Sequence, residues 1–381
     1  MPRILVTAAE ASADSLAAAV IECLRATNPN IEAFGIAGPA LRSVGVEAVA
    51  RTEDISVMGL TEVVPALPRI LGIMSRVTRE AAHRRPDLAI LVDSPDLNLR
   101  MARRLRRLGV PILYFVAPMV WAWRQWRTRE VSRVVDRLCV ILPFEEKVWL
   151  DAGVQVTYVG HPMVDLFPAV ERGSGSPAEA RVEETDVVTV ALLPGSRRME
   201  VVRCLPAMLR AVKIVAARRE GPVRIVIPVA PTIDEQWVSG IAGEIAPELH
   251  PAVSRNGARE ALVQSDAAVV ASGTVALEAA LAHCPMVVVY RVSWGTWFAG
   301  RTLVRAPFVS LPNLLMGREI VPELLQADMQ PESVAAELDH ILPGGKNRER
   351  MKADLEEVRR LLGPGGAADR VALEAEKLMN R

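Results

Sequence analysis

Val190-Ala-Leu-Leu-Pro-Gly-Ser-Arg-Arg-Met-Glu200 has the pattern of a buried strand, a tight turn and the beginning of a helix. The apolar run Val187–Leu193 has the length of a strand in a parallel sheet. Gly195 permits the turn, and Ser196 can cap the helix. Free amides at a helix start suit a phosphate, and Arg197 beside them can contact a pyrophosphate. A plain strand-to-helix turn with a surface arginine has the same pattern, so both interpretations stay open.

The same unit of strand, turn and helix recurs along the chain. Helix-period apolar positions occur in residues 15–25, 67–84, 97–108 and 128–135. This alternation predicts an α/β protein. We expect two Rossmann-like, doubly wound parallel-sheet domains that face each other across a cleft, with ligands beyond the carboxyl ends of the strands. The strand candidates are Ile4–Ala8, Ala33–Ala37, Leu88–Val92, Ile112–Val116, Leu138–Leu142, Val187–Leu193, Val223–Pro228, Ala267–Ala271 and Met286–Tyr290.

The expected domain boundaries lie where this alternation stops. It covers residues 1–166, the N-terminal domain, and resumes over residues 187–330, the C-terminal domain. Residues 167–186 are rich in Gly, Ser, Pro, Ala and Glu, which predicts a linker or an exposed loop. Residues 331–381 are helical and charged, with a break at 363–366. These C-terminal helices pack on the N-terminal domain or on a partner chain, and the sequence leaves both open.

The composition argues against several functional classes. The 381 residues carry no formal net charge and half are hydrophobic, so we expect no nucleic-acid partner. Four cysteines lie in separate apolar runs without metal-ligand spacing, which predicts buried thiols in a reducing cytoplasm. The first residues lack the pattern of a secretion signal, and no uncharged stretch is long enough to cross a bilayer. We therefore expect a cytoplasmic protein whose membrane contact is peripheral.

A second turn of the same design lies in Ala271-Ser-Gly-Thr-Val-Ala-Leu-Glu278. Ser272, Gly273 and Thr274 lead from a strand into a helix whose first amides would again suit a phosphate. Glu278 follows in the first turns, where its carboxylate can accept hydrogen bonds from two ribose hydroxyls. The alternative is that Glu278 binds no ligand and only interacts favourably with the helix dipole. Two such turns in one domain favour a nucleoside diphosphate site, since the G-x-G-x-x-G motif of a dinucleotide site is missing after the first strand.

Leu91-Val-Asp-Ser-Pro-Asp96 ends a buried strand of the first domain. A carboxylate at the carboxyl end of such a strand is well placed to act as a general base toward a hydroxyl, and Asp93 has that position. Pro95 suits the first helical position, and Asp96 is expected to cap the helix. A capping role is also open for Asp93.

Aromatic residues and arginines are concentrated in Pro118-Met-Val-Trp-Ala-Trp-Arg-Gln-Trp-Arg127. Such clusters serve sugar stacking, protein interfaces and membrane surfaces. Trp121, Trp123 and Arg124 are therefore candidates for a substrate or membrane surface. A buried structural cluster is the alternative.

A second candidate for that surface consists of Val57, Met58 and Leu60, which lie around a glycine. In residues 69–137 the same domain carries fifteen arginines against six acidic residues. Apolar residues flanked by basic ones hold peripheral proteins on anionic membranes. The alternative is that the three apolar residues belong to the core and the arginines form a solvated face.

Many of these motifs occur together in one known family. The chain resembles the lipid-A-disaccharide synthases over roughly residues 3–327, and the tryptophan and Ser-Leu-Pro-Asn segments are specific to that family. The motifs are, in order, Val57-Met-Gly-Leu60 with Glu62-Val63, Asp93-Ser-Pro-Asp96, Val120-Trp-Ala-Trp-Arg124, Leu142-Pro-Phe-Glu145, Gly160-His161, Leu193-Pro-Gly-Ser-Arg197 with Glu200, Ala271-Ser-Gly-Thr274 with Glu278, and Val309-Ser-Leu-Pro-Asn313 with Gly317-Arg-Glu319.

The resemblance implies a GT-B fold and an inverting sugar transfer that needs no metal and no cofactor. The donor would be UDP-2,3-diacylglucosamine and the acceptor 2,3-diacylglucosamine 1-phosphate (lipid X). The product would be the β-1,6-linked disaccharide of lipid A, made on the inner face of the cytoplasmic membrane. The N-terminal domain would face the membrane and the acceptor, and the C-terminal domain would bind the UDP-sugar. A homodimer is left open.

The resemblance also transfers roles to single residues. Asp93 corresponds to the family's proposed base and Glu10 to the acidic residue of the first-domain loop. Arg197 and Asn313 correspond to other positions critical for activity. The loop departs from the family pattern, because Ala9 and Ala13 stand where glycines are expected. These alanines would be strained if the positions need a positive φ, or would narrow the acceptor pocket.

Two other functions remain open at this stage. One is a different UDP-sugar enzyme of the same architecture, such as a 2-epimerase or a transferase acting on a cell-wall lipid. The other is a nucleotide-sugar binding module without activity, which the two loop alanines suggest.

Overall fold

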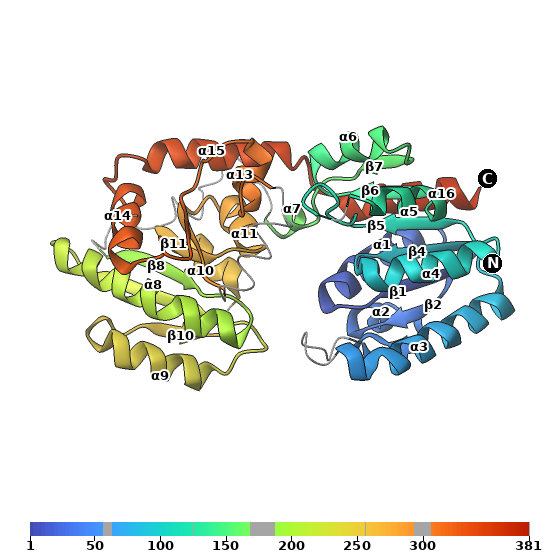
Figure 1. Ribbon diagram of the computed structural model, residues 1–381, viewed down its shortest axis with the longest axis horizontal. Coiled ribbons are helices and arrows are strands. Elements are labelled where there is room, and N and C mark those ends of the chain that lie inside the picture. The colour runs from blue at the N-terminus through green and yellow to red at the C-terminus, as the bar shows by residue number, and fades with distance from the viewer. Residues whose placement is uncertain (56–62, 124, 168–186, 256, 293–305, 381) are drawn as a thin grey trace. The chain divides into compact units, whose positions relative to one another are not determined.

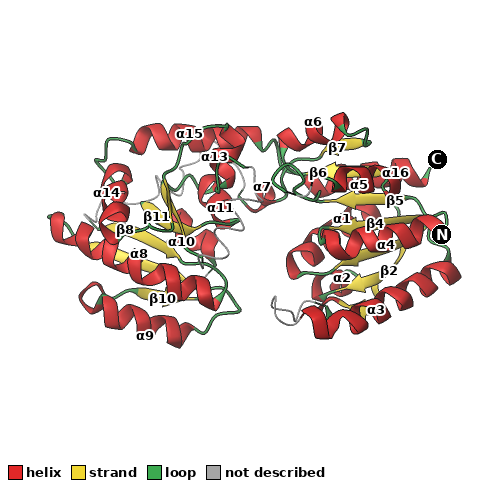
Figure 2. Ribbon diagram, in the orientation of Figure 1, coloured by secondary structure: helices red, strands yellow, loops and turns green. Residues whose placement is uncertain are grey.

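The computed structural model describes residues 1–55, 63–123, 125–167, 187–255, 257–292 and 306–380. The chain forms two compact units, Met1–Asp165 together with Leu362–Arg381, and Leu166–Leu361 (Figure 1). Each unit has a parallel β-sheet between layers of helices (Figure 2). The predicted class, two doubly wound α/β domains, is confirmed.

The sheet of unit 1 has the strand order β3-β2-β1-β4-β5-β6-β7. The order reverses between β1 and β4, where Ala8 pairs with Val92 at the carboxyl ends. The elements of this unit are β1 (Arg3–Ala8), α1 (Ala11–Thr27), β2 (Glu32–Ala37), α2 (Pro39–Ser43), β3 (Glu47–Arg51), the 3₁₀ turn η1 (Thr52–Asp54), α3 (Val63–Arg84), β4 (Leu88–Val92), α4 (Pro95–Arg107), β5 (Ile112–Phe115), α5 (Arg127–Val134), β6 (Arg137–Val140), α6 (Pro143–Asp151), β7 (Val156–Tyr158), α7 (Met163–Leu166) and α16 (Ala367–Met379).

Two apolar cores explain why the strands of unit 1 are continuously hydrophobic. Alternate residues of a strand point to opposite faces, and both faces are covered by helices. In β1, Leu5 belongs to the core beneath α3 and α4, whereas Ile4 and Val6 belong to the core beneath α1 and α16. The sheet is therefore buried on both sides.

The last helix completes the second of these cores. Val371, Ala375 and Leu378 of α16 pack in it, and Arg137 of β6 makes an ion pair of 3.0 Å with the buried Glu374. Residues 331–381 thus do not stay together, since α14 and α15 belong to unit 2 and α16 packs on unit 1 of the same chain.

Unit 2 repeats the plan with the strand order β10-β9-β8-β11-β12-β13, which reverses between β8 and β11. Its elements are β8 (Val188–Leu193), α8 (Arg198–Arg218), β9 (Val223–Pro228), α9 (Glu235–Ile245), the 3₁₀ turn η2 (Pro247–Leu249), β10 (Ala252–Ser254), α10 (Ala258–Gln264), β11 (Ala267–Ala271), α11 (Val275–Leu281), β12 (Met286–Tyr290), α13 (Leu311–Met316), β13 (Glu323–Leu325), α14 (Pro331–Ile341) and α15 (Arg348–Leu361).

Two details bear on the expectations from composition. Three of the four cysteines are buried, but Cys23 is only half-buried, so the prediction of a buried thiol is wrong there. No helix in the described part of the chain is both long enough and apolar enough to cross a membrane.

Candidate functional site

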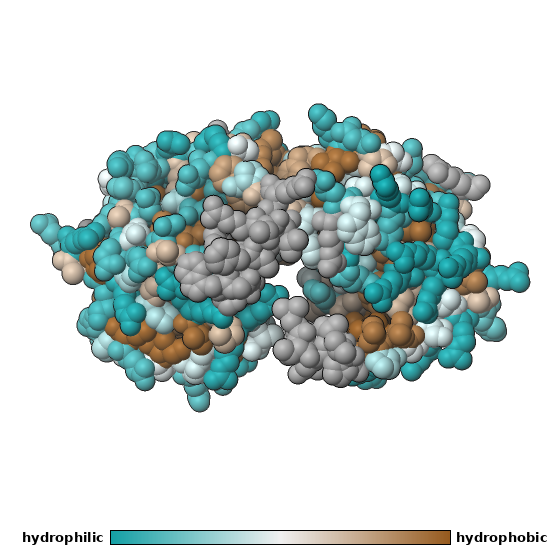
Figure 3. All heavy atoms as spheres, in the orientation of Figure 1, coloured by the Kyte–Doolittle hydropathy of each residue, from teal (hydrophilic) through white to brown (hydrophobic). Residues whose placement is uncertain are grey.

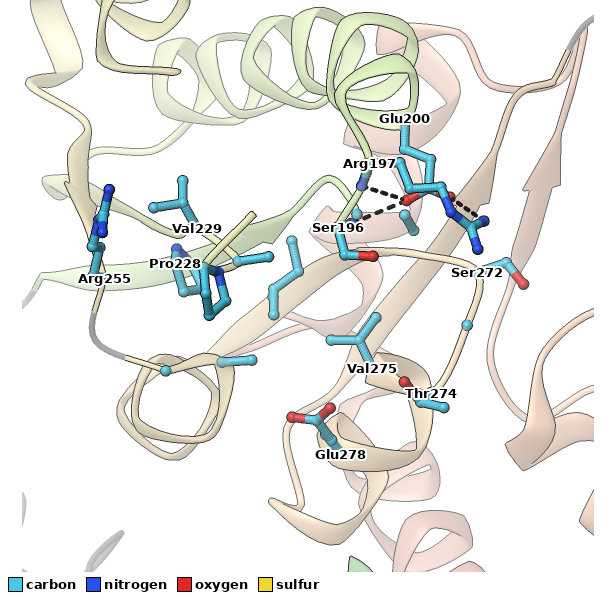
Figure 4. A pocket seen from close by; sticks show the side chains of 18 residues that line it. Ser196, Arg197, Glu200, Pro228, Val229, Arg255, Ser272, Thr274, Val275 and Glu278 are labelled. Atoms are coloured by element: carbon cyan, nitrogen blue, oxygen red, sulfur yellow. Dashed lines mark hydrogen bonds and ion pairs between the residues drawn. The ribbon is translucent and has the colours of Figure 1, made fainter. Parts of the chain in front are cut away.

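A pocket of about 490 Å³ opens in unit 2 where the strand order reverses. Two parallel strands that diverge to opposite sides leave a crevice beyond their carboxyl ends, which is where ligands bind in such sheets. The ends of β8 and β11 both line this pocket (Figure 4). The structure brings together there all the residues proposed for the UDP-sugar, namely Gly195, Ser196, Arg197, Ser272, Gly273, Thr274 and Glu278.

The turn after β8 is held by a carboxylate of its own helix. Glu200, in the first turn of α8, accepts hydrogen bonds from the amides of Ser196 and Arg197 at 3.0 and 3.1 Å. Its other oxygen pairs with the Arg197 guanidinium at 3.2 Å (Figure 4). The amides that we expected to be free for a phosphate are therefore already used. What this turn offers a ligand is the Arg197 side chain, which is 81% exposed.

Gly195 is required by this geometry. Its φ of +111° lies in a region that side chains with a Cβ rarely adopt. An added Cβ would also lie 2.4 Å from Glu200 Oε2. A larger residue would therefore strain the turn and displace the carboxylate that holds it.

The turn after β11 supplies the opposite wall of the pocket. The amides of residues 273–275 stand at the start of α11, where a helix supplies no acceptor of its own. Glu278 lies one turn further, on the pocket side of α11 (Figure 4). Its burial raises the pKa of the carboxyl above the ordinary value.

The pocket also has residues that the sequence did not single out. The end of β9 contributes an apolar wall, and the segment after β10 contributes Arg255, which lies 3.6 Å from Glu235. The sequence could have indicated the residues after β9, because β9 was predicted as a strand and the strands of a parallel sheet end at one edge. These residues are Pro228, Val229, Ala230, Pro231, Arg255, Gly257 and Ala258.

In unit 1 the strand order also reverses, and Asp93 and Glu10 lie at that point. Asp93 follows Val92, and Glu10 comes two residues after Ala8, the partner of Val92. Asp93 is half-buried, and this burial raises the pKa of its carboxyl, while the amide of Ser94 lowers it. Glu10 is exposed and directly precedes α1.

Asp96 does not cap α4 as we expected. It lies inside the first turn and forms an ion pair with Arg127, whose side chain is buried. The N-cap position is held by Ser94, and its side chain makes no capping hydrogen bond. Asp96 thus connects α4 to α5.

The two alanines that depart from the family pattern are not strained. Among the described residues with positive φ other than glycine, neither Ala9 nor Ala13 is found. Both are buried, Ala9 in the core beneath α3 and Ala13 within α1. Asp14, in the first turn of α1, accepts hydrogen bonds from the amides of Gly38 and Ala40 at 2.7 Å each and so caps α2. The two alanine positions are therefore packed into unit 1, whereas Glu10, Ala11 and Ser12 between them are exposed.

Asn313 does not fit a direct catalytic role. Its side chain is fully buried, and its amide nitrogen donates to Val321 O and Glu323 Oε1 at 2.9 and 2.8 Å. Its oxygen accepts the amides of Ile320 and Val321 at 2.8 and 3.0 Å. An asparagine amide has two donors and two acceptor sites, and all four are used. Asn313 therefore holds the segment after α13 in place.

The tryptophan segment is only partly exposed. Trp121 donates from Nε1 to Glu145 Oε1 at 3.1 Å, and its ring meets Phe144 edge to face at 5.1 Å. Trp123 and Trp126 are exposed. Of the residues predicted for this surface, Val57, Met58, Leu60 and Arg124 lie outside the described residues.

Within the described ranges, no three His, Cys, Asp or Glu side chains come together as a metal site would require. The polar groups of the pocket are instead hydroxyls, Arg197, Arg255 and two glutamates.

The chain matches a family described as lipid-A-disaccharide synthetase over residues 4–372. It is similar to the lipid-A-disaccharide synthase of Myxococcus xanthus (strain DK1622), with 47% identity over 379 residues that cover 99% of this chain and 98% of that protein. The enzyme of the same description from Solibacter usitatus (strain Ellin6076) is 43% identical over 381 residues, or 100% and 98% of the two chains.

Solved structures with the same fold include a UDP-GlcNAc 2-epimerase from Neisseria meningitidis bound to UDP-GlcNAc, with a TM-score of 0.63, 12% identity and full coverage of both chains. The glycotransferase of kitacinnamycin has a TM-score of 0.64 at 16% identity and covers 99% of this chain and 98% of its own. At such identities the likeness concerns the fold alone, and it agrees with the expected GT-B fold. Together with the match along nearly the whole sequence, these findings show that the chain belongs to the lipid-A-disaccharide synthase family.

Proposed function

We propose that the protein transfers a diacylglucosamine unit from UDP to 2,3-diacylglucosamine 1-phosphate and so forms the β-1,6 disaccharide of lipid A. The observation that supports this most is the pocket at the reversal point of unit 2. This pocket combines two strand-to-helix turns, the exposed side chain of Arg197 and the carboxylate of Glu278 on α11. These groups match the needs of a nucleoside diphosphate.

In this proposal the diphosphate of the donor contacts Arg197 and the start of α11, and the ribose hydroxyls bind Glu278. The amides of Ser196 and Arg197 take no part, because Glu200 occupies them. A guanidinium is a strong partner for phosphate oxygens, because it offers several donors and a permanent charge. It would also stabilise the charge that grows on UDP as the sugar leaves.

Asp93 is the proposed base. The 6-hydroxyl oxygen of the acceptor attacks the anomeric carbon of the donor from the face opposite UDP. Its proton passes to the Asp93 carboxylate, the new C–O bond forms, and the bond from the anomeric carbon to UDP breaks with both electrons going to UDP. A half-buried carboxylate with a raised pKa is a better proton acceptor than an ordinary one. Glu10, at the same edge of the sheet, is assigned to the acceptor.

The proposal includes peripheral binding to the inner face of the cytoplasmic membrane, where both acylated substrates would lie. Leu67 and Leu71 of α3 are exposed at one helical turn's spacing, and hydrophobic residues gather over α3 in Figure 3. Trp123 and Trp126 are exposed as well, and α4 presents arginines. Apolar insertion next to basic residues is the usual design of such a surface.

Acceptor dependence of UDP release tests this proposal. We expect the purified protein to release UDP from the diacylated UDP-sugar only when lipid X is present. An epimerase would change the donor alone, and a binding module would release no UDP in either mixture. Either result would contradict the proposal.

Asp93→Asn should abolish the base without changing the size of the side chain. General-base catalysis contributes on the order of a hundredfold or more, so kcat should fall by about that factor while UDP binding is kept. Calorimetry with UDP checks that unit 2 is intact. Near-parental turnover by the folded variant would remove Asp93 from this role.

A further inference from the structure

Three fully buried polar side chains converge beneath the turn that carries Asp93. Tyr114 of β5 donates its hydroxyl to the Asp93 carbonyl at 2.6 Å. Asn98 of α4 donates from Nδ2 to the same carbonyl at 2.8 Å and to the Val92 carbonyl at 2.9 Å. Thr7 of β1 donates its hydroxyl to Asn98 Oδ1 at 2.7 Å. Thr7 lies on β1, Tyr114 on β5, and Asn98 on α4, which is the first helix after Asp93.

The backbone at this turn needs such support. Asp93 and Ser94 have φ values of +51° and +44°, two consecutive left-handed residues that are not glycine. This conformation costs free energy in each residue and persists only when the surroundings hold it. A carbonyl oxygen has two lone pairs, and Tyr114 and Asn98 use both on Asp93. The peptide between Asp93 and Ser94 is thereby fixed on two sides.

We propose that Tyr114 and Asn98 are positioning residues for the base, and that they hold the peptide after Asp93 so that its carboxylate is presented in the one orientation that the transfer needs. Thr7 supports them by fixing the Asn98 amide. The inference rests on the proposed role of Asp93. It concerns residues that do not touch a substrate themselves, since all three side chains are fully buried.

The chemistry of Tyr114 suits a fixed donor. Burial raises the pKa of its phenol well above the ordinary value, so the hydroxyl stays protonated and keeps donating throughout the working pH range. The other ionisable groups that act on Tyr114 are Asp96, Arg127 and Glu130. None of them is altered in the test below.

Tyr114→Phe removes the hydroxyl and keeps the buried ring. A misplaced catalytic group costs rate rather than affinity, so we expect kcat to fall by about tenfold or more with little change in the KM for the UDP-sugar. The loosened turn should also let water reach Asp93, which lowers its pKa. The acid limb of the pH profile of kcat should therefore move to lower pH.

Ser265→Ala is the matched control. It removes another buried hydroxyl that donates to a carbonyl, that of Ala261 at 2.7 Å, at the amino-terminal edge of the unit 2 sheet. We expect this variant to lose stability but to keep the parental kcat and pH profile. If kcat falls as much in Ser265→Ala as in Tyr114→Phe, the lower kcat of both variants reflects reduced stability, and the proposal is overturned.

Two further variants separate the possible outcomes. Thr7→Val keeps nearly the same side-chain size. It should lower kcat and move the acid limb to lower pH, as Tyr114→Phe does, but by a smaller amount. This variant provides the test if Tyr114→Phe does not fold. Parental kcat and pH profile in both variants, with Asp93→Asn inactive, would overturn the positioning role alone. An active Asp93→Asn would instead overturn the proposed base itself.

Discussion

At the scale of single residues, the shape of the pocket in unit 2 depends on how Gly195 and Glu200 fit together. The glycine adopts a φ of +111°, and the carboxylate of Glu200 fills the space in which a side chain would start. This contact fixes the turn that presents Arg197. The turn is therefore sensitive to one added methyl group.

Gly195→Ala should weaken UDP binding. The change displaces Glu200 and moves Arg197, and loss of one charge-assisted hydrogen bond costs about 1.5–3 kcal/mol, or roughly tenfold to a hundredfold in Kd. Calorimetry with UDP measures this change in Kd. Gly240→Ala in α9 is the control, because apart from its chain neighbours and the backbone of its own helix no atom lies within 4 Å of the added carbon, and it should leave Kd unchanged. Equal affinities in the two variants would place the diphosphate elsewhere.

Glu145 should make stability depend on pH near neutrality. Burial raises its pKa to about 7, although Trp121 and the amide of Leu142 donate to it. The folded state therefore binds this proton more tightly than the unfolded state, for which the ordinary value is 4.5. The contribution of Glu145 to the free energy of unfolding is therefore fully present below pH 4.5 and is lost as the pH rises through about 7.

Glu145→Gln isolates this contribution, because it keeps the shape and removes the titration. Between pH 5 and pH 8 the free energy of unfolding of the parent should fall relative to the variant. His161, with its pKa lowered to about 4 by burial, acts in the opposite direction in both proteins and cancels in the difference. Chemical denaturation at several pH values gives the comparison, and a difference independent of pH would contradict the assignment.

At the residue level, the sequence predicted which side chains lie together at the ends of strands, but it did not predict the hydrogen bonds that those side chains make. The residues proposed for the donor all line one pocket, because strands of a parallel sheet end at one edge. Sequence could not show that Glu200 takes the amides of its own turn, or that the amide of Asn313 is fully used. Both depend on side-chain geometry that residue type leaves open.

At the scale of elements, α3 is the helix with the clearest external role. Its buried face packs into unit 1 through Met74 and Val77, while Leu67 and Leu71 remain exposed near its start. Exposed leucines one turn apart are costly in water unless something covers them. A membrane surface is the partner proposed for them.

Leu67→Ser with Leu71→Ser should weaken binding to vesicles of phosphatidylglycerol at low salt. Burial of one leucine contributes about 1.5–3 kcal/mol at most, so the loss should reach tenfold or more. Leu108→Ser with Leu373→Ser, two other exposed leucines of unit 1, is the control. Sedimentation with vesicles gives the bound fraction, which should also decrease as salt screens the arginines. Equal binding by both double variants would exclude α3 from the contact.

Elements were predictable in proportion to their burial. The central strands β1, β4, β8 and β11 are almost entirely buried and mostly apolar, and they were predicted with boundaries within a residue or two. The outer strands were missed, because they are only three to five residues long and partly exposed. These are β3, β7, β10 and β13. The packing of α16 on unit 1 was left open, since a helical pattern does not say which sheet it covers.

At the scale of the whole molecule, each unit repeats one arrangement, a parallel sheet whose order reverses next to its first strand. The reversal in unit 2 carries the pocket, and the reversal in unit 1 carries Asp93. Each unit therefore offers one crevice in which the proposed transfer can place a substrate. The proposed transfer assigns one substrate to each unit.

The central claim is that these two substrates are joined. Mass spectrometry of the products from the diacylated UDP-sugar and lipid X tests it directly, with Asp93→Asn as the inactive control. We predict one new product with the mass of lipid X plus one diacylglucosamine residue, formed together with UDP by the parent and nearly absent with the variant. Recovery of both substrates unchanged, or of a modified donor without any disaccharide, would contradict the account.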